Sequence, residues 1–381
     1  MLLALTEDQT LLSRTALGFV AEHAPLSQLR KLRDAGDERG YSRATYSKMA
    51  ELGWTAIPFS EEDGGLGAGL AEFILVTEAM GRTLAPEPLI PSVLLAGRTL
   101  ALAGSSAQKN EWLAPVIAGD KVQALAYSAP RGRYDLTRVP FVAERAGNGY
   151  KLSGKASAVW GGQLADGYVL AARTSGKDGE REGISLFVVP ATSKGLKTQR
   201  QTRVDSINAA ELTLEAVELS ESSGLLGRVG EGYKVLSRVI DEGTVALGGE
   251  MLGGMTEALE RTRVYLRERR QFGVAIGSFQ ALKHRAARLF VELELSRSAV
   301  MAAARALDEE SPDAALLVSV AKARLSDAYT LVANEAVQLH GGIGMTDEHD
   351  IGFFMKRARA SELTFGDSAF HRDRFAALSG Y

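Results

Sequence analysis

The sequence predicts a multidomain α+β protein: a helical N-terminal domain, a small antiparallel β-barrel or β-sandwich, and a C-terminal four-helix bundle. In the first third of the chain, apolar residues recur at the three- and four-residue spacing of amphipathic helices. Near Lys121, short segments rich in β-formers take over, and turn residues separate them. Long helical patterns return after Gly230. We therefore expect three domains, at residues 1–120, 121–222 and 223–381.

Local signals indicate where individual elements begin and end. The first helix is expected to start at Thr6, because Thr6-Glu7-Asp8-Gln9 resembles a capping box. The glycine-rich stretch from Pro58 to Gly69 is typical of a plain loop between helices, and the run from Lys177 to Gly183 of a solvated hairpin loop. Strands are expected at Val122–Ser128, Gly149–Leu152, Gly167–Ala172, Ile184–Val189 and Ala210–Leu214. The bundle helices are expected at Tyr233–Leu266, Ser278–Leu307, Pro312–Leu339 and Asp350–Ser361.

Composition excludes several classes of function. At 381 residues the chain exceeds the usual size of one core, and its 45% apolar and 24% charged residues are typical of globular proteins. A net charge of -3 gives no field that would attract nucleic acid or an anionic membrane. The absence of cysteine excludes disulfides, thiolate metal sites and a cysteine nucleophile. Five histidines without a carboxylate cluster predict no metal site.

The chain also shows no targeting or membrane signal. The apolar stretch Met1 to Leu5 is followed by acidic residues and is too short for a signal peptide. Other apolar runs fall short of the roughly 20 residues needed to span a bilayer. We expect a cytoplasmic protein.

Two glycine-punctuated motifs in the last third are candidates for binding chemistry. Glu268-Arg269-Arg270-Gln271-Phe272-Gly273 continues into Ile276 to His284 and connects two expected helices. A guanidinium beside a helix start suits a phosphate group, although the residues alone favour a helix corner with a structural salt bridge. Gln338-Leu339-His340-Gly341-Gly342-Ile343-Gly344 follows another helix, and its glycines allow close approach of the backbone to a ligand. As a glycine cluster alone, it is also explained by a helix C-cap and turn.

Together and in this order, these motifs resemble the acyl-CoA dehydrogenase family, and the resemblance extends over nearly the whole chain. Further matches are Leu52-Gly53-Trp54, Gly64-Gly65-x-Gly67, Glu78-x-x-Gly81-Arg82, Trp112-Leu113-x-Pro115, Ala126-Tyr127-Ser128-Ala129-Pro130 and Gly230-Glu231-Gly232. The resemblance implies the three-domain fold of that family and FAD bound at a dimer interface. It assigns Arg269, Gln271, Phe272 and Gln280 to one subunit's part of the FAD site, and Gln338 and Gly342 to the neighbour's part.

The resemblance also assigns the flavin-facing part of the β-domain. Ser128 stands in place of a threonine that hydrogen-bonds the flavin, and its hydroxyl can keep that role. The tryptophan that flanks the flavin is replaced by Ala158, and Trp160 is the expected substitute. The family's Gly-x-Gly-Ser turn is altered to Arg131-Gly132-Arg133-Tyr134.

The residues that match the family's catalytic base are not carboxylates. In the family, a carboxylate removes the α-proton of an acyl-CoA thioester while the β-hydrogen leaves as hydride to the flavin. The two positions that carry this base in the family match Phe365 and Gly243. Asp241 and Glu242 precede Gly243 but are expected to point away from its direction. Asp367 is the best substitute in the chain, and a turn or cap role is its plain alternative.

A chain that keeps the FAD residues but lacks the base is similar to the partner subunits of heteromeric bacterial acyl-CoA dehydrogenases, including those that act on steroid side-chain thioesters. In such heterotetramers, one subunit carries the base and its paralogue completes the flavin site. We therefore expect a partner subunit that acts on an acyl-CoA with an electron-transfer flavoprotein as acceptor. One alternative is a self-sufficient homotetrameric dehydrogenase, a dimer of dimers, that uses Asp367 or another base. The other is a flavin oxidase or monooxygenase on the same fold. The acyl group, whether fatty, steroid or aromatic, is left open.

Overall fold

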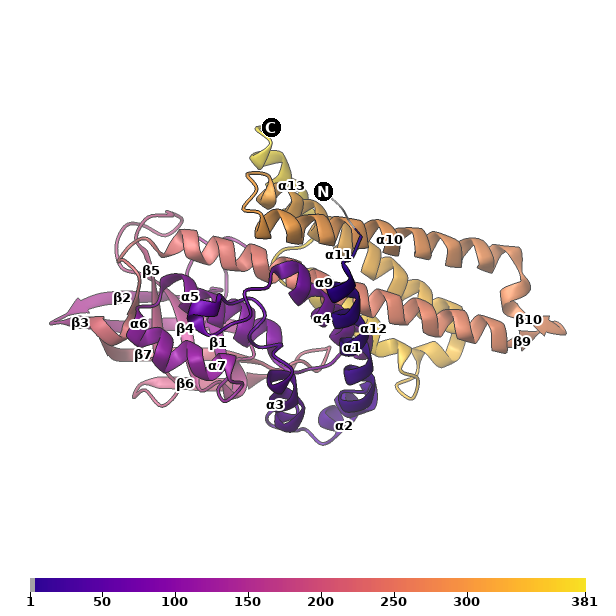
Figure 1. Cartoon of the computed structure of the whole chain (residues 1–381), viewed down its shortest axis with the longest axis horizontal. Helices are drawn as coiled ribbons and strands as arrows, with labels where there is room; N and C mark the ends of the chain where they lie inside the picture. The colour runs from indigo at the N-terminus through magenta and orange to yellow at the C-terminus, as the bar shows by residue number, and fades with distance from the viewer. Residues whose placement is uncertain (1–3) are drawn as a thin grey trace. The chain divides into compact units, whose positions relative to one another are not determined.

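The computed structural model describes residues 4–381, and the chain forms two compact units within it (Figure 1). The helical unit contains the described residues up to Arg30, together with Gly69–Ala85 and Thr244–Tyr381. The sheet unit contains Lys31–Ala68 and Pro86–Gly243. The first three residues of the predicted apolar N-terminus lie outside the described residues.

The sheet unit is built around an eight-stranded sheet with the order β6-β7-β3-β2-β4-β5-β8, in which β1 also pairs with β4. Its strands are β1 (Gln123–Ala126), β2 (Phe141–Ala146), β3 (Gly149–Trp160), β4 (Gly167–Arg173), β5 (Ile184–Pro190), β6 (Leu196–Gln201), β7 (Ala209–Ser220) and β8 (Leu225–Leu226). The five predicted strands are therefore present, and β2, β6 and β8 are additional. Most pairings are antiparallel, as predicted, but β4 pairs in parallel with both β1 and β2. The predicted solvated loop, Lys177 to Gly183, connects β4 to β5, and most of it is exposed.

Apolar side chains on one face of this sheet form its core. Phe141, Leu152, Tyr168, Leu170, Phe187 and Leu212 are among the buried members. Short helical segments complete the unit: α3 (Arg43–Glu51), η1 (Glu61–Asp63), η2 (Leu89–Gly97), α5 (Arg98–Ala103), α6 (Ser106–Gln108), η3 (Lys109–Leu113), α7 (Ala114–Ile117), η4 (Gly162–Leu164) and α8 (Glu221–Gly224). Helix α2 (Leu26–Asp34) connects the two units.

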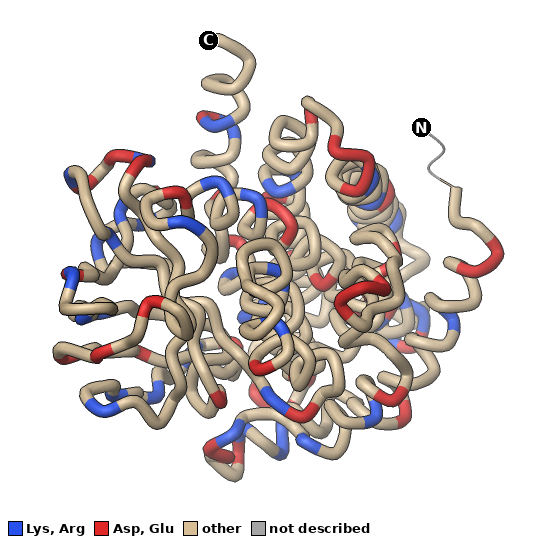
Figure 2. Tube along the Cα trace, turned by 60° about the vertical axis from the view of Figure 1, so that its left-hand side comes forward, with Lys and Arg blue, Asp and Glu red and all other residues tan. Residues whose placement is uncertain are grey.

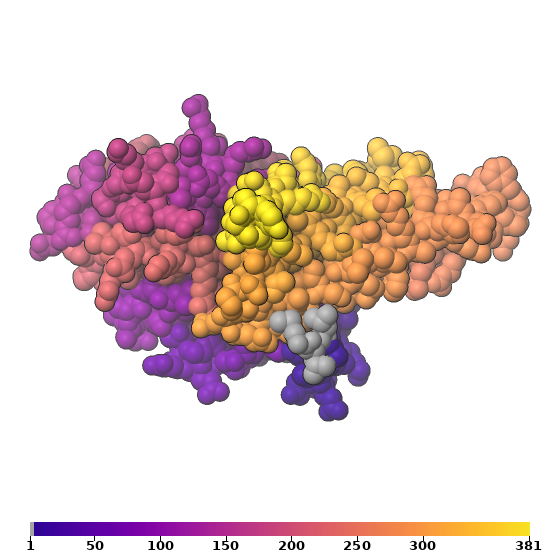
Figure 3. Space-filling model, turned by 90° about the horizontal axis from the view of Figure 1, so that it is seen from above, coloured from indigo at the N-terminus to yellow at the C-terminus, as the bar shows by residue number. Residues whose placement is uncertain are grey.

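The C-terminal part of the helical unit contains the four predicted long helices and one more. They are α9 (Gly232–Glu268, which starts in the sheet unit), α10 (Gln280–Asp308), α11 (Ala314–His340) and α12 (Ile351–Leu363); the sequence did not predict α13 (Ser368–Leu378). Figure 3 shows the yellow C-terminal segment lying on the surface against the orange part of the chain. Helix α1 (Glu7–His23) begins with the predicted capping box, in which the Thr6 hydroxyl accepts a hydrogen bond from the backbone N–H of Gln9. No helix within residues 4–381 is both long and apolar enough to cross a membrane.

Helices α4 (Leu70–Thr83) and α9 approach so closely that glycine is required at their contact. A Cβ atom at Gly253 would overlap the carbonyl oxygen of Glu78, and one at Gly81 would overlap the carbonyl oxygen of Glu250. The Thr77 hydroxyl on α4 donates a hydrogen bond of 2.9 Å to the carbonyl of Ala246 on α9. The small residues among the apolar positions of α9 therefore set the distance between the two helices.

Charges of both signs are interspersed along the trace in the view of Figure 2. This distribution agrees with the small net charge of -3 and with the prediction of no strong field of one sign.

We expect the substitution Gly253→Ala to lower the thermal unfolding midpoint, because the added methyl group forces α4 away from α9. Overpacking of this kind destabilises by about 1–3 kcal/mol. The matched control is Gly18→Ala, an exposed position in α1 where an added Cβ meets nothing within 4 Å. Alanine should be neutral or stabilising there. Equal midpoints for the two variants, measured by scanning calorimetry, would contradict the proposed contact.

Candidate functional site

The first glycine-punctuated motif forms an exposed hairpin between α9 and α10. Strands β9 (Arg270–Gln271) and β10 (Val274–Ala275) pair antiparallel, and the N–H of Ile276 donates to the carbonyl of Arg269 at 2.8 Å. At the tip, Phe272 has φ 55° and is 91% exposed, and its ring lies edge-on to that of Phe279. An exposed large aromatic side chain is uncommon, and so is a left-handed backbone at a residue other than glycine. The hairpin therefore holds the Phe272 ring in solvent at its tip.

The start of α10 adds hydrogen-bond donors beside this hairpin. Gln280 is its first residue, and Phe279 at the N-cap offers no side-chain acceptor to the first backbone N–H groups. Gln271 uses its side-chain nitrogen to donate to the carbonyl of Arg270 at 2.8 Å. The exposed Arg269 guanidinium lies on the same segment. This segment thus carries two kinds of donor that suit an anionic group, the uncapped N–H groups of α10 and the guanidinium of Arg269.

The second glycine-punctuated motif begins where α11 ends. Gly341 has φ 66° and ψ -145°, and η6 (Gly341–Met345) follows it. A Cβ atom at Gly341 or Gly342 would meet nothing within 4 Å, so the backbone there is open to a neighbouring group. The conformation of Gly341 explains why glycine is favoured at that position.

A ring stack brings the two motifs to the same end of the helical unit. His340 lies 4.5 Å from Tyr265, measured between ring centroids, and Tyr265 is four residues before Arg269. His340 is buried, its Nδ1 lies 2.7 Å from the Ala336 carbonyl, and burial lowers the pKa of its imidazole. These contacts give His340 a packing role.

Ser128 and Trp160 belong to the sheet unit. Ser128 follows β1, and its carbonyl accepts a hydrogen bond of 3.4 Å from the N–H of Ser157 on β3. The register between β3 and β7 shifts between Ala156 and Val159, and Ala158 has φ 54° within this bulge. A bulge changes the direction of the side chains that follow it. The register shift before Val159 therefore affects the direction of the Trp160 side chain.

The residue that matches the first base position, Phe365, lies in the turn between α12 and α13. Phe365 is 8% exposed with φ 62°, and Gly366 follows with φ 115°. Asp367 is the N-cap of α13, and its carboxylate accepts a hydrogen bond of 2.9 Å from the N–H of Phe370. Asp367, the first carboxylate after Phe365 in the sequence, therefore caps a helix. A cap or turn role is the alternative to a role as base that the sequence left open.

The second base position, Gly243, lies within α9, and its preceding glutamate is held in ion pairs. Glu242 is 5% exposed, and its two oxygens accept hydrogen bonds of 2.9 and 3.0 Å from the guanidinium of Arg98. Arg238 donates a third, of 3.1 Å. Asp241 is also buried. Both oxygens of the Glu242 carboxylate therefore have guanidinium partners.

Family models describe three consecutive parts of the chain. The acyl-CoA dehydrogenase N-terminal domain matches residues 6–120, the middle domain matches 124–217, and the C-terminal domain matches 230–379. The chain belongs to the acyl-CoA dehydrogenase family. Members of this family are FAD-dependent oxidoreductases that act on CH–CH groups.

Relatives of this acyl-CoA dehydrogenase family member cover nearly its full length. The probable acyl-CoA dehydrogenase YngJ of Bacillus subtilis is 29% identical over 342 residues, which are 88% of this chain and 90% of YngJ. A solved structure described as an electron transferring flavoprotein of Acidaminococcus fermentans has a TM-score of 0.92 at 29% identity, with 100% of both chains covered. The ChsE4–ChsE5 complex from Mycobacterium tuberculosis contains a chain with a TM-score of 0.90 at 25% identity, again with 100% of both chains covered.

The donor set of the helical unit fits the cofactor of the acyl-CoA dehydrogenase family. FAD carries a pyrophosphate, for which a guanidinium and uncapped helix N–H groups are suitable donors. The open backbone at Gly341 and Gly342 leaves room for close approach. When bound, the flavin supplies the acceptor for a hydride.

One buried charged residue, Lys322 on α11, was not singled out from the sequence. Its side chain is fully buried, and burial lowers the pKa of its amine to about 7, although Glu362 and Asp367 oppose this shift. The available signal was a lysine at helical spacing between the buried positions Val318 and Leu325. A lysine on the apolar face of a helix is rare enough to predict a specific partner.

We expect Arg98→Ala to destabilise the protein strongly, because it removes the better buried of the two cationic partners of Glu242. The Arg98 side chain is 18% exposed and that of Arg238 is 40% exposed. Breaking a buried ion pair costs about 3–5 kcal/mol. The control, Arg238→Ala, removes an exposed partner of the same carboxylate and should cost about 0–1 kcal/mol. Calorimetric midpoints that fall equally in the two variants would contradict this ranking.

Proposed function

We propose that this chain is the base-lacking partner subunit of a heterotetrameric acyl-CoA dehydrogenase, in which it completes the FAD site of a paralogous subunit. The observation that carries the proposal is the pair of positions in the turn after α12. The side chain of Phe365 has no atom that can accept a proton, and the Asp367 carboxylate accepts a hydrogen bond from the N–H of Phe370 as a helix cap. At the other base position, Gly243 has no side chain, and Glu242 is held by Arg98 and Arg238.

In this role, the residues of this chain bind and orient the cofactor and do not exchange protons with the substrate. Arg269 holds phosphate charge at the start of α10, with Gln271, Phe272 and Gln280 on the same segment. Gln338 and Gly342 serve the neighbouring subunit's half of the cofactor site. Ser128 and Trp160 serve the flavin from the β-domain. A subunit with these contacts but without a base binds FAD and leaves α-proton removal to its partner.

Two similar proteins support the proposed partners. One chain with the same fold comes from a complex of two differently named proteins, ChsE4 and ChsE5, which supports a paralogous subunit. Another similar structure is described as an electron transferring flavoprotein, which supports such a protein as electron acceptor. We further propose an acyl-CoA thioester as substrate, domain boundaries near residues 120 and 222, and a cytoplasmic location.

We expect the purified chain alone to bind less than one FAD per subunit and to show no acyl-CoA-driven bleaching of the flavin. Co-expression with a paralogue that carries the glutamate should restore both, because the second chain supplies the base. Absorbance at the flavin maximum measures the bleaching, and native mass measures the FAD content of each subunit. Stoichiometric FAD and rapid bleaching by the lone chain would overturn the proposal. Oxygen consumption by the lone chain would instead indicate an oxidase or monooxygenase.

The Asp367→Asn variant separates the capping role of this residue from a role as base. Asparagine is as good an N-cap as aspartate, so the fold should be kept. If the lone chain bleaches and Asp367→Asn abolishes bleaching with FAD still bound, the self-sufficient enzyme replaces our proposal. We expect no effect of this substitution on the bleaching rate of the mixed complex.

Arg269→Ala should weaken retention of FAD in the mixed complex by about 10- to 100-fold, the range expected for loss of hydrogen bonds to a charged group. Arg267→Ala is the control, since Arg267 is an exposed arginine two residues earlier on α9. Fluorescence titration of released FAD measures both. Equal retention in the two variants would remove Arg269 from the proposed site.

A further inference from the structure

The turn between α12 and α13 is held by a buried lysine from a third helix. The ammonium of Lys322 donates hydrogen bonds to the carbonyl of Glu362 at 2.9 Å, the carbonyl of Gly366 at 2.7 Å and the hydroxyl of Ser326 at 3.1 Å. A lysine ammonium has three N–H donors. All three are therefore used, and two of them fix backbone carbonyls on either side of Phe365.

A second buried side chain holds the carbonyl between these two. His371 on α13 is 1% exposed, and its Nε2 lies 3.1 Å from the carbonyl oxygen of Phe365. A carbonyl oxygen can only accept, so Nε2 carries the proton in this contact. Burial and the nearby charge of Lys322 lower the pKa of His371 to about 3, which keeps the ring neutral. The carbonyls of residues 362, 365 and 366 are thus fixed by donors from α11 and α13.

The turn needs such support because its backbone is unfavourable. Phe365 has φ 62°, a conformation that L-residues with a side chain adopt at a cost. At Gly366, φ is 115°, and an added Cβ would lie 2.8 Å from the Nε2 of His371. A strained residue persists only where its surroundings fix it, and such residues are concentrated at functional sites.

We propose that Lys322 is a positioning residue that fixes the turn carrying residue 365, so that this turn keeps one defined geometry although its side chain is not a base. The inference rests on the proposed function, which places the lost base at Phe365. Lys322 acts through the backbone of the turn and not on the substrate. The charged groups that face it are Glu362 and Asp367, and no ion pair of Lys322 occurs among residues 4–381.

Hydrogen exchange of the full-length protein tests the proposal directly. Lys322→Met leaves the carbonyls of Glu362 and Gly366 without their donor. The peptide spanning residues 363–371 contains the hydrogen-bonded amides of Thr364, Phe370 and His371. We expect these amides to exchange about 10- to 100-fold faster in Lys322→Met, the factor expected when buried carbonyls lose a partner.

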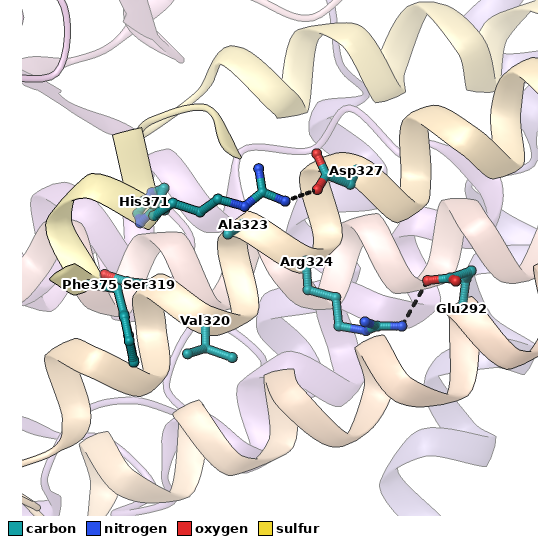
Figure 4. Close-up of a pocket in the computed structure, with 9 residues that line it drawn as sticks. Glu292, Ser319, Val320, Ala323, Arg324, Asp327, His371 and Phe375 are labelled. Atoms are coloured by element: carbon teal, nitrogen blue, oxygen red, sulfur yellow. Dashed lines mark hydrogen bonds and ion pairs between the residues drawn. The ribbon is translucent and has the colours of Figure 1, made fainter. Parts of the chain in front are cut away.

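The control is Arg324→Met, which removes a charge from the same helix without removing a hydrogen bond to the turn. Arg324 lines a cavity of about 360 Å³ between α10, α11 and α13, and donates to Glu292 at 2.8 Å (Figure 4). Its variant should leave exchange of residues 363–371 unchanged. Lys322→Gln keeps two donors and should fall between wild type and Lys322→Met. Wild-type exchange in Lys322→Met, or equal loss in Arg324→Met, would overturn the proposal.

Restoring a carboxylate at residue 365 gives a second readout. Phe365→Glu is expected to give acyl-CoA-driven bleaching in the FAD-loaded mixed complex whose partner has lost its own base. Adding Lys322→Met should slow this bleaching at least about tenfold and shift its pH profile, with KM unchanged. An unchanged rate and profile would overturn the positioning role. Absence of bleaching in Phe365→Glu itself would count against the proposed function, while hydrogen exchange still decides the role of Lys322.

Discussion

The contact between α4 and α9 is the constraint on which the helical unit depends. Glycine at positions 81 and 253 lets the two backbones meet, because a Cβ at either position would overlap a carbonyl of the opposite helix. At this distance, Thr77 reaches the carbonyl of Ala246, and Arg82 forms two hydrogen bonds with Glu257. The start of α4 is capped from α10, where the Asp308 carboxylate accepts from the N–H groups of Leu70 and Ala71. Because the backbones of α4 and α9 lie this close together, the polar contacts between the two helices have a fixed geometry.

Three carboxylates near the positions of the family's base have structural partners. Glu242 is held by Arg98 and Arg238 in the sheet unit. Glu250 in the helical unit accepts a hydrogen bond of 2.6 Å from Arg357, and both side chains are nearly inaccessible. Asp367 caps α13. A carboxylate with such partners is held in one position by its hydrogen bonds. The acidic residues at these places therefore have structural roles in the described fold.

The fold could be predicted from the sequence where the interactions that decide it are local. The capping box at Thr6 and the four long helices follow from residues a few positions apart, and the structure confirms them. Helix α13 was missed because its 11 residues carry little amphipathic pattern and only Ser368 and His371 are buried. Strand β2 was missed because its exposed half contains Glu144 and Arg145. The parallel pairing of β1 with β4 joins residues more than 40 positions apart, and alternation along one strand does not indicate its neighbour.

The sequence by itself determined the family, the glycine-punctuated motifs, and the absence of a carboxylate at positions 365 and 243, because each is a matter of residue identity. It also left the base role of Asp367 open, since a carboxylate before a helix can be a cap or a base. Only the tertiary structure decided what the buried charges do. Lys322 reaches the carbonyl of Gly366 across 44 positions, and Glu242 meets Arg98 across 144. A buried charge is tolerated only where partners surround it, and those partners come from segments that folding brings together.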